Sequence, residues 1–368
     1  MFHFLYVVGE IFMEKLTDVI EKINEIREFK TIDIVKRLGV LSADRISLEN
    51  YPEKNPVKAF NASILVKKDN LYIYARLILG YYRYISVIAR IDANIADIIS
   101  GNISARTYPG EIIVGTDTEY DFWGSEDPRV QIIGDKVLMT YTGRTKWYFE
   151  KSKSLEKSKR ISSLVAKSDD GVKNWRKIAV LIFPEEHRNG FEMSKNVTFL
   201  NGKNNLHVLH RPQFYSKYFP LVIGAVSKDV LQSEKLKEFK LKENTVVCEA
   251  ANFEDKIGWG PPPIKVGNDE YVILLHGVDN YLKTYRIFAM LLREEKKLKP
   301  IAVTPHYIME PKTIYELYGD RPMVVFPCGA QLIDDNIIIS YGAADAFIGF
   351  GSINLSQLMA TLDKNRIE

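Results

Sequence analysis

The stretch GSEDPRVQIIGDKVLMTYTGR, from Gly124 to Arg144, contains the pattern that decides the fold. A polar turn at 134–136 precedes the run VLMTY at 137–141. Alternate residues of an extended run face opposite sides of a sheet, and a polar turn just before it is typical of a β-hairpin. The stretch therefore predicts a short strand that follows a tight turn.

The same turn-and-strand pattern recurs four more times. The first strand residues of the five copies are separated by 66, 69, 65 and 66 residues. A near-constant long period made of short strands and turns is typical of a β-propeller. We therefore predict an all-β, five-bladed β-propeller. The other copies are LYIYAR from Leu71, LHVLHR from Leu206, YVILLH from Tyr271 and IIISYG from Ile337.

Most copies end in or next to a polar side chain. A propeller would bring the ends of equivalent strands to one axial pocket, which no single blade forms. For Arg76 an ordinary surface arginine is an equally good interpretation, because arginine is mostly exposed in proteins. The five residues are Arg76, Arg144, Arg211, His276 and Asp345.

The bulk composition excludes some classes of function. The 368 residues carry 50 Lys and Arg against 47 Asp and Glu, a net charge of +3, so net charge indicates neither a nucleic-acid nor a membrane partner. Cys248 and Cys328 give no disulfide framework and no metal-ligand spacing. We expect no metal, a cytoplasmic location and two buried thiols, with one disulfide between them as the alternative. The N-terminal run MFHFLYVVGEIF lacks a basic leading region and is too short to span a bilayer.

An amphipathic helix is predicted near the N-terminus. From Met13 to about Leu38, isoleucines and leucines recur at helical spacing with charged residues between them. We expect residues 1–45 to form a helical extension that packs on the propeller or on a second subunit, making a homo-oligomer. Residues 46–368 are then the catalytic propeller.

The acidic pair of the opening stretch is the main candidate for chemistry. Cleavage of a glycosidic bond needs a carboxylic acid that protonates the leaving oxygen, and Arg129 follows the pair Glu126 and Asp127 closely. Adjacent residues of an extended segment point opposite ways, so one carboxylate would act on the substrate while the other fixes the loop. A salt bridge within a turn is the alternative interpretation.

Several side chains elsewhere are further candidates. Lys146 follows a strand end, and Lys195 precedes the third strand copy. Trp259, in KIGWGPPPIK, is expected to form a flat surface on which a sugar stacks. Tyr281 follows the fourth copy, in LLHGVDNY.

Together these motifs resemble glycoside hydrolase family 130, the β-mannoside phosphorylases and related hydrolases. EDPRV, MTYTGR, LHRP, KIGWGPPPIK, LLHGVDNY, YELYGDRPMVVFPCGA and ISYGAAD occur in that order from about Asn55 to Ile353. The resemblance implies a five-bladed propeller. It also implies inverting phosphorolysis, in which inorganic phosphate attacks a β-mannoside and gives α-mannose 1-phosphate.

The resemblance also implies roles for residues. Asp127 matches the general acid, with its proton relayed through a sugar hydroxyl. Asn61, Arg76 and Asp345 match the glycone contacts by position, and Glu126, Arg129 and Trp259 are expected beside the substrate. Phosphate is already a nucleophile and needs cations and donors to hold it. Its candidate ligands are Arg144, Lys146, Lys195, Arg211, His276 and Tyr281.

Two alternatives remain open. A hydrolase of the same family would need a carboxylate base for water, and Asp279 lies near His276 in the sequence. The other alternative is a propeller that binds glycans without catalysing a reaction. The expected partners are a small oligosaccharide and phosphate, with no other cofactor, no nucleic acid and no membrane.

Overall fold

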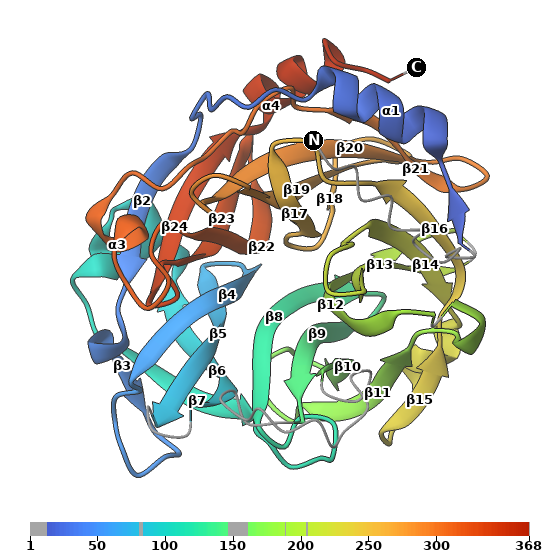
Figure 1. Cartoon of the computed structure of the whole chain (residues 1–368). Coiled ribbons are helices and arrows are strands. Elements are labelled where there is room, and N and C mark those ends of the chain that lie inside the picture. Colours follow the sequence, from blue (N-terminus) through green and yellow to red (C-terminus); the bar gives the residue numbers. More distant parts are fainter. Residues whose placement is uncertain (1–12, 81–83, 146–160, 188, 204, 368) are drawn as a thin grey trace.

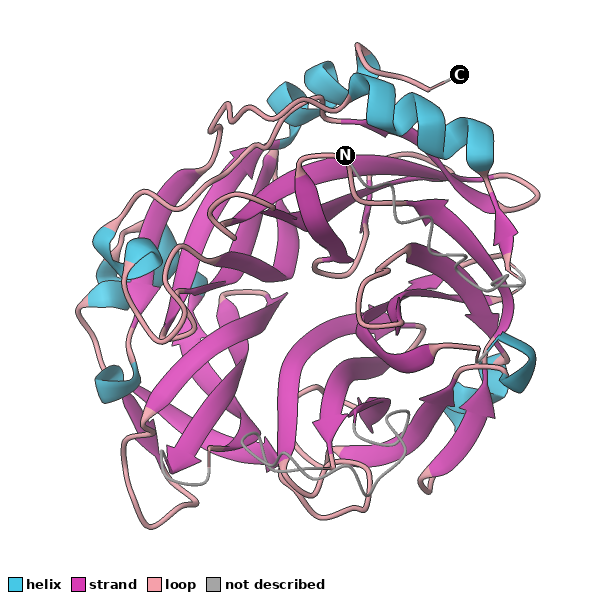
Figure 2. Ribbon diagram, in the orientation of Figure 1, coloured by secondary structure: helices cyan, strands magenta, loops and turns pink. Residues whose placement is uncertain are grey.

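The computed structural model describes residues 13–80, 84–145, 161–187, 189–203 and 205–367. These residues form five β-sheet blades arranged as a ring around a central axis (Figure 1). The helices lie at the outside of the ring (Figure 2). The predicted five-bladed propeller is therefore confirmed.

Each blade has four main strands, and the first strands of successive blades β4, β8, β12 and β17 pack on one another. A single residue pair, Ser86 with Gly124, joins the sheets of blades 1 and 2. Blade 1 consists of β4 (Lys58–Lys67), β5 (Asn70–Gly80), β6 (Ile85–Asn94) and β7 (Tyr108–Val114). Blade 2 consists of β8 (Gly124–Ile133), β9 (Lys136–Arg144), β10 (Ile161–Ser168) and β11 (Arg176–Ile182).

The remaining blades repeat this order. Blade 3 consists of β12 (Phe191–Asn201), β13 (Leu206–Phe214), β14 (Leu221–Val226) and β16 (Lys242–Cys248). Blade 4 consists of β17 (Glu254–Trp259), β19 (Glu270–Asp279), β20 (Tyr285–Glu294) and β21 (Leu298–Val303). Blade 5 consists of β22 (Val325–Ile333), β23 (Asn336–Ala343), β24 (Phe347–Asn354) and β2 (Lys36–Leu41).

Short elements decorate the ring. Four short strands extend the blades: β1 (Glu14–Lys15), β3 (Ile46–Leu48), β15 (Lys237–Lys240) and β18 (Ile264–Lys265). The α-helices are α1 (Thr17–Ile26), α2 (Ile95–Ile99), α3 (Ile314–Leu317) and α4 (Leu355–Asp363), and the 3-10 helices are η1 (Ala43–Arg45), η2 (Asn102–Ser104), η4 (Glu185–His187) and η5 (Lys228–Gln232). In the described part of the chain, no helix has the length and apolar composition that crossing a bilayer requires.

The five predicted strands are the second strands of the five blades, β5, β9, β13, β19 and β23. In β9, Leu138 packs into the core between blades 2 and 3, whereas Met139 and Tyr141 pack into the core between blades 1 and 2. Both faces of a blade are thus covered by neighbouring blades. This explains why the strand copies are apolar throughout.

The N-terminal helix is shorter than predicted. Helix α1 ends at Ile26, and the following segment runs extended, where Glu28 N donates to Pro305 O and Ile32 N donates to Tyr307 O. The run TIDIV at 31–35 is rich in β-branched residues, which favour extended backbone. Residues 36–41 then pair with β24 and complete blade 5, so an early segment closes the ring (Figure 1).

Candidate active site

Three neighbouring blades carry the same bulge on their first strand. The pairing register shifts between Phe60 and Ser63 in β4, between Glu126 and Arg129 in β8, and between Lys195 and Thr198 in β12. A bulge bends the strand and redirects a side chain. The bulged residues Asn61, Asp127 and Asn196 have left-handed φ angles of 48°, 53° and 55°. Asn and Asp tolerate this conformation better than other residues with side chains do.

These bulges open onto a pocket at the ring centre, to which all five blades contribute. Its volume is about 170 Å³. The lining holds six cationic side chains against three carboxylates, so it attracts anions. It is lined by Asn61, Arg76, Tyr84, Glu126, Asp127, Arg144, Lys195, Asn196, Arg211, Lys256, His276, Tyr285, Arg321, Val324, Phe326 and Asp345.

The acidic pair lies on one side of this pocket. Glu126 Oε1 accepts hydrogen bonds from Arg76 Nη2 and Arg144 Nε, both at 2.9 Å. Lys195 Nζ lies 3.8 Å from Glu126 Oε2. Burial raises the pKa of Glu126, but these three cations outweigh burial and hold the pKa below its ordinary value. Glu126 is therefore an anion that orders the surrounding cations.

Asp127 has fewer contacts than Glu126. Its Oδ1 accepts a hydrogen bond from Asn61 Nδ2 at 2.8 Å and lies 3.3 Å from Arg76 Nη1. Burial raises the pKa of Asp127, while Arg76, Lys195 and the Asn61 hydrogen bond together bring it below its ordinary value. The Asp127 carboxyl group is thus ionised in the free pocket.

Arg211 lies on the blade 3 side of the pocket with few partners of its own. The side chain is buried, and its guanidinium carbon lies 5.3 Å from the centre of the Phe219 ring. Within the described part of the chain, its Nε has no hydrogen-bond partner. No carboxylate of the described residues forms an ion pair with it. Burial lowers the pKa of Arg211 to about 10. A buried guanidinium that lacks an anion is suited to bind one from solution.

Lys195 and His276 stand beside Arg211. Burial lowers the pKa of Lys195 to about 8, against the opposing effect of Glu126. Burial, followed by the charge of Arg211, lowers the pKa of His276 well below its ordinary value, so its imidazole is neutral. The buried Nδ1 of His276 has no hydrogen-bond partner in the part of the chain that the structure describes. A neutral imidazole can donate from one ring nitrogen and accept at the other.

Asp345 lines the pocket from blade 5, in the turn after β23. Its φ angle is 50°, and its Oδ2 lies 3.6 Å from Arg321 Nε. Burial raises the pKa of Asp345, although Arg321 and Arg76 act in the other direction.

The structure brings nine of the sequence-predicted residues to this pocket. All five strand-end groups are among them, because equivalent positions of the second strands end at the same face of the ring. The nine are Asn61, Arg76, Glu126, Asp127, Arg144, Lys195, Arg211, His276 and Asp345. Lys146 lies outside the described residues.

Three predicted residues do not line the pocket. Trp259 is fully buried and its Nε1 donates to His210 O at 3.0 Å, so the prediction that a sugar stacks on it is wrong. Tyr281 is 74% exposed in the turn after β19, where its ring lies 5.8 Å from that of Phe29. Arg129 is buried behind the bulge and donates to the carbonyls of Gly260, Trp259 and Asp127. Arg129 thus holds the Asp127 backbone in place.

Sequence reasoning missed several lining residues. Asn196 could have been predicted from the repeat, because Asp127 follows Asn61 by 66 residues and Asn196 follows Asp127 by 69 residues. Lys256 begins the KIGWGPPPIK motif, in which Trp259 is the predicted site residue. Tyr84, Tyr285, Arg321 and Phe326 gave no pattern of their own.

Asp279, the residue considered as a base for water, has a structural position. Its carboxylate accepts hydrogen bonds from Tyr281 N, Leu282 N, Thr284 N and Arg286 Nη1. It is fully buried at the β19–β20 turn and does not line the pocket. Asp279 is therefore not placed to activate a water there. The described residues also contain no group of three or more His, Cys, Asp and Glu side chains that could hold a metal ion.

Comparisons with known proteins agree with this architecture. A family model described as beta-1,4-mannooligosaccharide phosphorylase matches residues 25–364. A beta-1,2-mannobiose phosphorylase of Thermoanaerobacter sp. (strain X514) is 27% identical over 325 residues, which cover 83% of this chain and 96% of that protein. A 1,2-beta-oligomannan phosphorylase of the same organism is 30% identical over 247 residues, 67% of this chain and 73% of that protein.

A solved structure shares the fold. The beta-1,2-mannobiose phosphorylase of Listeria innocua, in complex with beta-1,2-mannobiose, superposes with a TM-score of 0.67 at 18% identity. The superposition covers 90% of this chain and 99% of that one.

Proposed function

This chain belongs to glycoside hydrolase family 130, and from that membership we propose that it catalyses inverting phosphorolysis of β-mannosides. Inorganic phosphate is the second substrate, and α-mannose 1-phosphate and the free leaving sugar are the products. The observation that carries the proposal is the buried Arg211, which has no ion-pair partner among the described residues, in a pocket whose cations outnumber its carboxylates.

The pocket suits a phosphate nucleophile. Arg211, Lys195 and His276 stand on blades 3 and 4, whereas Asp127 stands on blade 2. A phosphate oxygen held by these groups forms a bond to the anomeric carbon while the bond from that carbon to the leaving oxygen breaks. Charge-assisted hydrogen bonds to the phosphate stabilise the bound dianion. No base is needed, because phosphate is already a nucleophile.

Asp127 is the proposed general acid. Its proton goes to the leaving oxygen, relayed through a sugar hydroxyl as the family resemblance implies. The free pocket keeps Asp127 ionised, since nearby cations lower its pKa. A bound phosphate dianion offsets those cations and raises the pKa of Asp127 in the complex. Asp127 thus becomes protonated in the complex that already holds the phosphate nucleophile.

A groove next to the pocket is the proposed site of the leaving sugar. It shares Lys256, Tyr285 and Arg321 with the pocket, and Phe219 and Leu282 add apolar walls. Aromatic and apolar surfaces beside a few polar groups are typical of ligand sites. We propose β-1,2-linked manno-oligosaccharides as first candidates for the substrate, after the relative that matches over nearly its full length.

The test is to incubate the protein with β-1,2-mannobiose and β-1,4-mannobiose, each with and without phosphate. Phosphorus and proton NMR would identify mannose 1-phosphate and its anomeric configuration. Phosphate-dependent formation of the α anomer supports the proposal. Release of mannose at the same rate without phosphate would instead identify a hydrolase. Binding without turnover would identify a glycan-binding propeller.

The scheme uses only phosphate and groups of this chain, so it requires no cofactor. A cytoplasmic location and a homo-oligomer that forms through α1 remain predictions. The buried residues of α1, Ile20 and Ile23, pack on blades of the same chain.

A further inference from the structure

One wall of the pocket belongs to a short excursion between blades 4 and 5, residues 312–324, which we call the α3 loop. Arg321 and Val324 of this loop line the pocket, and Arg321 also lines the groove. The loop contacts other blades as well, because Asp320 pairs with Lys58 of blade 1 at 3.3 Å and Met323 O accepts from Tyr285 N. The position of the α3 loop therefore sets where Arg321 and Val324 lie in the pocket lining.

The α3 loop and the Asp345 turn are held together as one unit. Arg321 N donates to Ala344 O, and Ala344 N donates to Val324 O, both at 3.1 Å. Gly319 packs so closely that a Cβ there would lie 2.3 Å from Ala344 O. A shift of the loop therefore moves Asp345 together with Arg321.

Glu316 anchors the base of this loop. The side chain is fully buried, and its Oε2 accepts from the backbone nitrogens of Lys312 and Thr313 at 2.8 and 3.1 Å. Its Oε1 accepts from Tyr341 of β23 at 2.7 Å. Burial of the charged Glu316 carboxylate with neutral hydrogen-bond donors alone would lower the stability of the fold. Its charge therefore needs a cation as a partner.

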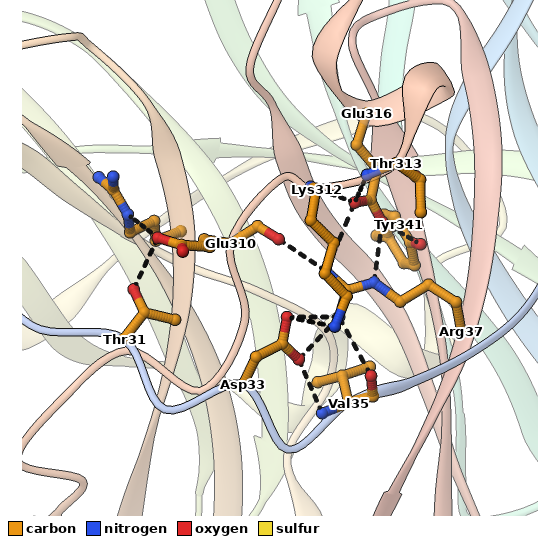
Figure 3. Close-up of polar contacts among 10 residues, drawn as sticks. Thr31, Asp33, Val35, Arg37, Glu310, Lys312, Thr313, Glu316 and Tyr341 are labelled. Carbon is orange, nitrogen blue, oxygen red and sulfur yellow. Dashed lines mark hydrogen bonds and ion pairs between the residues drawn. The ribbon is translucent and has the colours of Figure 1, made fainter.

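Arg37, from the N-terminal strand β2, supplies that cation (Figure 3). Its Nε donates to Glu316 Oε1 at 3.1 Å, and its Nη2 donates to Glu310 O at 2.6 Å. Its Nη1 donates to both oxygens of Asp33, at 2.7 and 2.6 Å. The planar guanidinium thus binds the N-terminal segment, the chain before α3, and α3 itself. Lysine cannot make this set of contacts, because it lacks the planar fork of donors.

We propose that Arg37 is a positioning residue for the part of the pocket that binds the mannoside, which includes Arg321 and Asp345. It acts through Glu316 to fix Arg321 and Asp345, while the proposed phosphate ligands Lys195, Arg211 and His276 stand on other blades. Loss of the Arg37–Glu316 pair is expected to weaken mannoside binding and to leave phosphate binding nearly unchanged. This inference rests on the proposed function.

The experiment compares Arg37→Lys and Glu316→Gln with Arg90→Lys as a matched control. Arg90 is also buried and binds a carboxylate through two nitrogens, with Asp92 as its partner, but it lies outside the pocket. For the two test variants, the KM for mannobiose is expected to rise roughly tenfold to a hundredfold, because a misplaced contact lowers productive binding. Their KM for phosphate should stay within roughly twofold of the wild type. The Arg90→Lys control is expected to be less stable than the wild type, with no selective rise of the KM for mannobiose over the KM for phosphate.

A parallel rise of both KM values, or no rise of either in a folded Arg37→Lys variant, would overturn the inference. Calorimetric titration of each variant with mannobiose in the absence of phosphate gives a second readout. If the wild type binds mannobiose but does not phosphorolyse it, the proposed function fails, and weaker binding by both test variants still supports the role of Arg37. Equal binding by wild type and test variants removes that role whatever the reaction is.

Discussion

Asn61 and Asp127 occupy equivalent bulges of neighbouring blades and meet between them, with Asn61 Nδ2 donating to Asp127 Oδ1 at 2.8 Å. Both residues have left-handed φ angles. Strained backbone of this kind persists where the surrounding structure holds it, often at functional sites. The amide occupies one carboxylate oxygen and so fixes the orientation of Asp127, the proposed general acid.

Asp127→Asn is expected to lower kcat for mannobiose by roughly 10²- to 10⁴-fold, the usual contribution of a general acid. The loss should be much smaller for 4-nitrophenyl β-mannoside, because nitrophenolate leaves without protonation. Steady-state rates with both substrates test this expectation. Asp135→Asn, in the exposed turn before β9, is the control. Full turnover of mannobiose by a folded Asp127→Asn variant would remove the catalytic assignment.

Arg211→Met should separate phosphate binding from stability. A charge-assisted hydrogen bond contributes about 1.5–3 kcal/mol, so the KM for phosphate is expected to rise roughly tenfold to a hundredfold. The substitution also removes a buried charge that has no ion-pair partner among the described residues. The free energy of unfolding without phosphate should therefore increase, by roughly 1 kcal/mol.

Thermal unfolding with and without phosphate measures both effects of Arg211→Met. The wild type should be stabilised by phosphate, since a ligand of the native state raises its stability. The variant should respond little. A variant that is less stable than the wild type and keeps its response to phosphate would mean that Arg211 is a structural residue.

The lowered pKa of Lys195 predicts that phosphate binding depends on pH. Its pKa of about 8 means that it is cationic below pH 8 and loses its proton as the pH rises through that value. The value of kcat/KM for phosphate should therefore fall above about pH 8, since this ratio reports groups of the free enzyme. Lys195→Arg keeps its charge, so its profile should be flat in that range. The same fall in both proteins would assign the titration to another group.

The same pKa has a consequence for stability. In the unfolded chain Lys195 titrates at its ordinary value near 10.5, above its pKa in the folded protein. Between about pH 8 and 10.5 the unfolded state therefore binds more protons, and this group makes stability rise with pH. Below pH 8 both states hold the proton, and its burial lowers stability by a constant amount. Denaturant titrations of wild type and Lys195→Met across this range would detect the difference in slope.

The repeat in the sequence predicted more than the number of blades. Because equivalent second strands end at one face of the ring, the polar residues at the five strand ends could be assigned to a common pocket before their distances were known. Arg76 and Asp345 come from blades 1 and 5, yet both line that pocket. A periodic pattern carries this information because each blade has the same local geometry.

Contacts between blades could not be predicted in this way. Glu126 and Asp127 look alike in an extended strand, and only the bulge and the cations from two other blades distinguish them. No pattern in the sequence indicated a role for Arg37, because its partner Glu316 is 279 residues away. The burial of Trp259 likewise depends on packing from several blades.

Trp259→Phe tests whether this tryptophan is structural. Its ring packs among core residues of blades 3 and 4, and its Nε1 donates to His210 O. Phenylalanine keeps most of the apolar contact but leaves that buried carbonyl without its donor, so the free energy of unfolding should fall by about 1–3 kcal/mol. The KM for mannobiose should be unchanged, because the side chain is fully buried and does not line the pocket. Denaturant unfolding and steady-state kinetics on the same preparation measure both quantities. A higher KM with unchanged stability would restore the sugar-stacking role and would require Trp259 to be exposed during turnover.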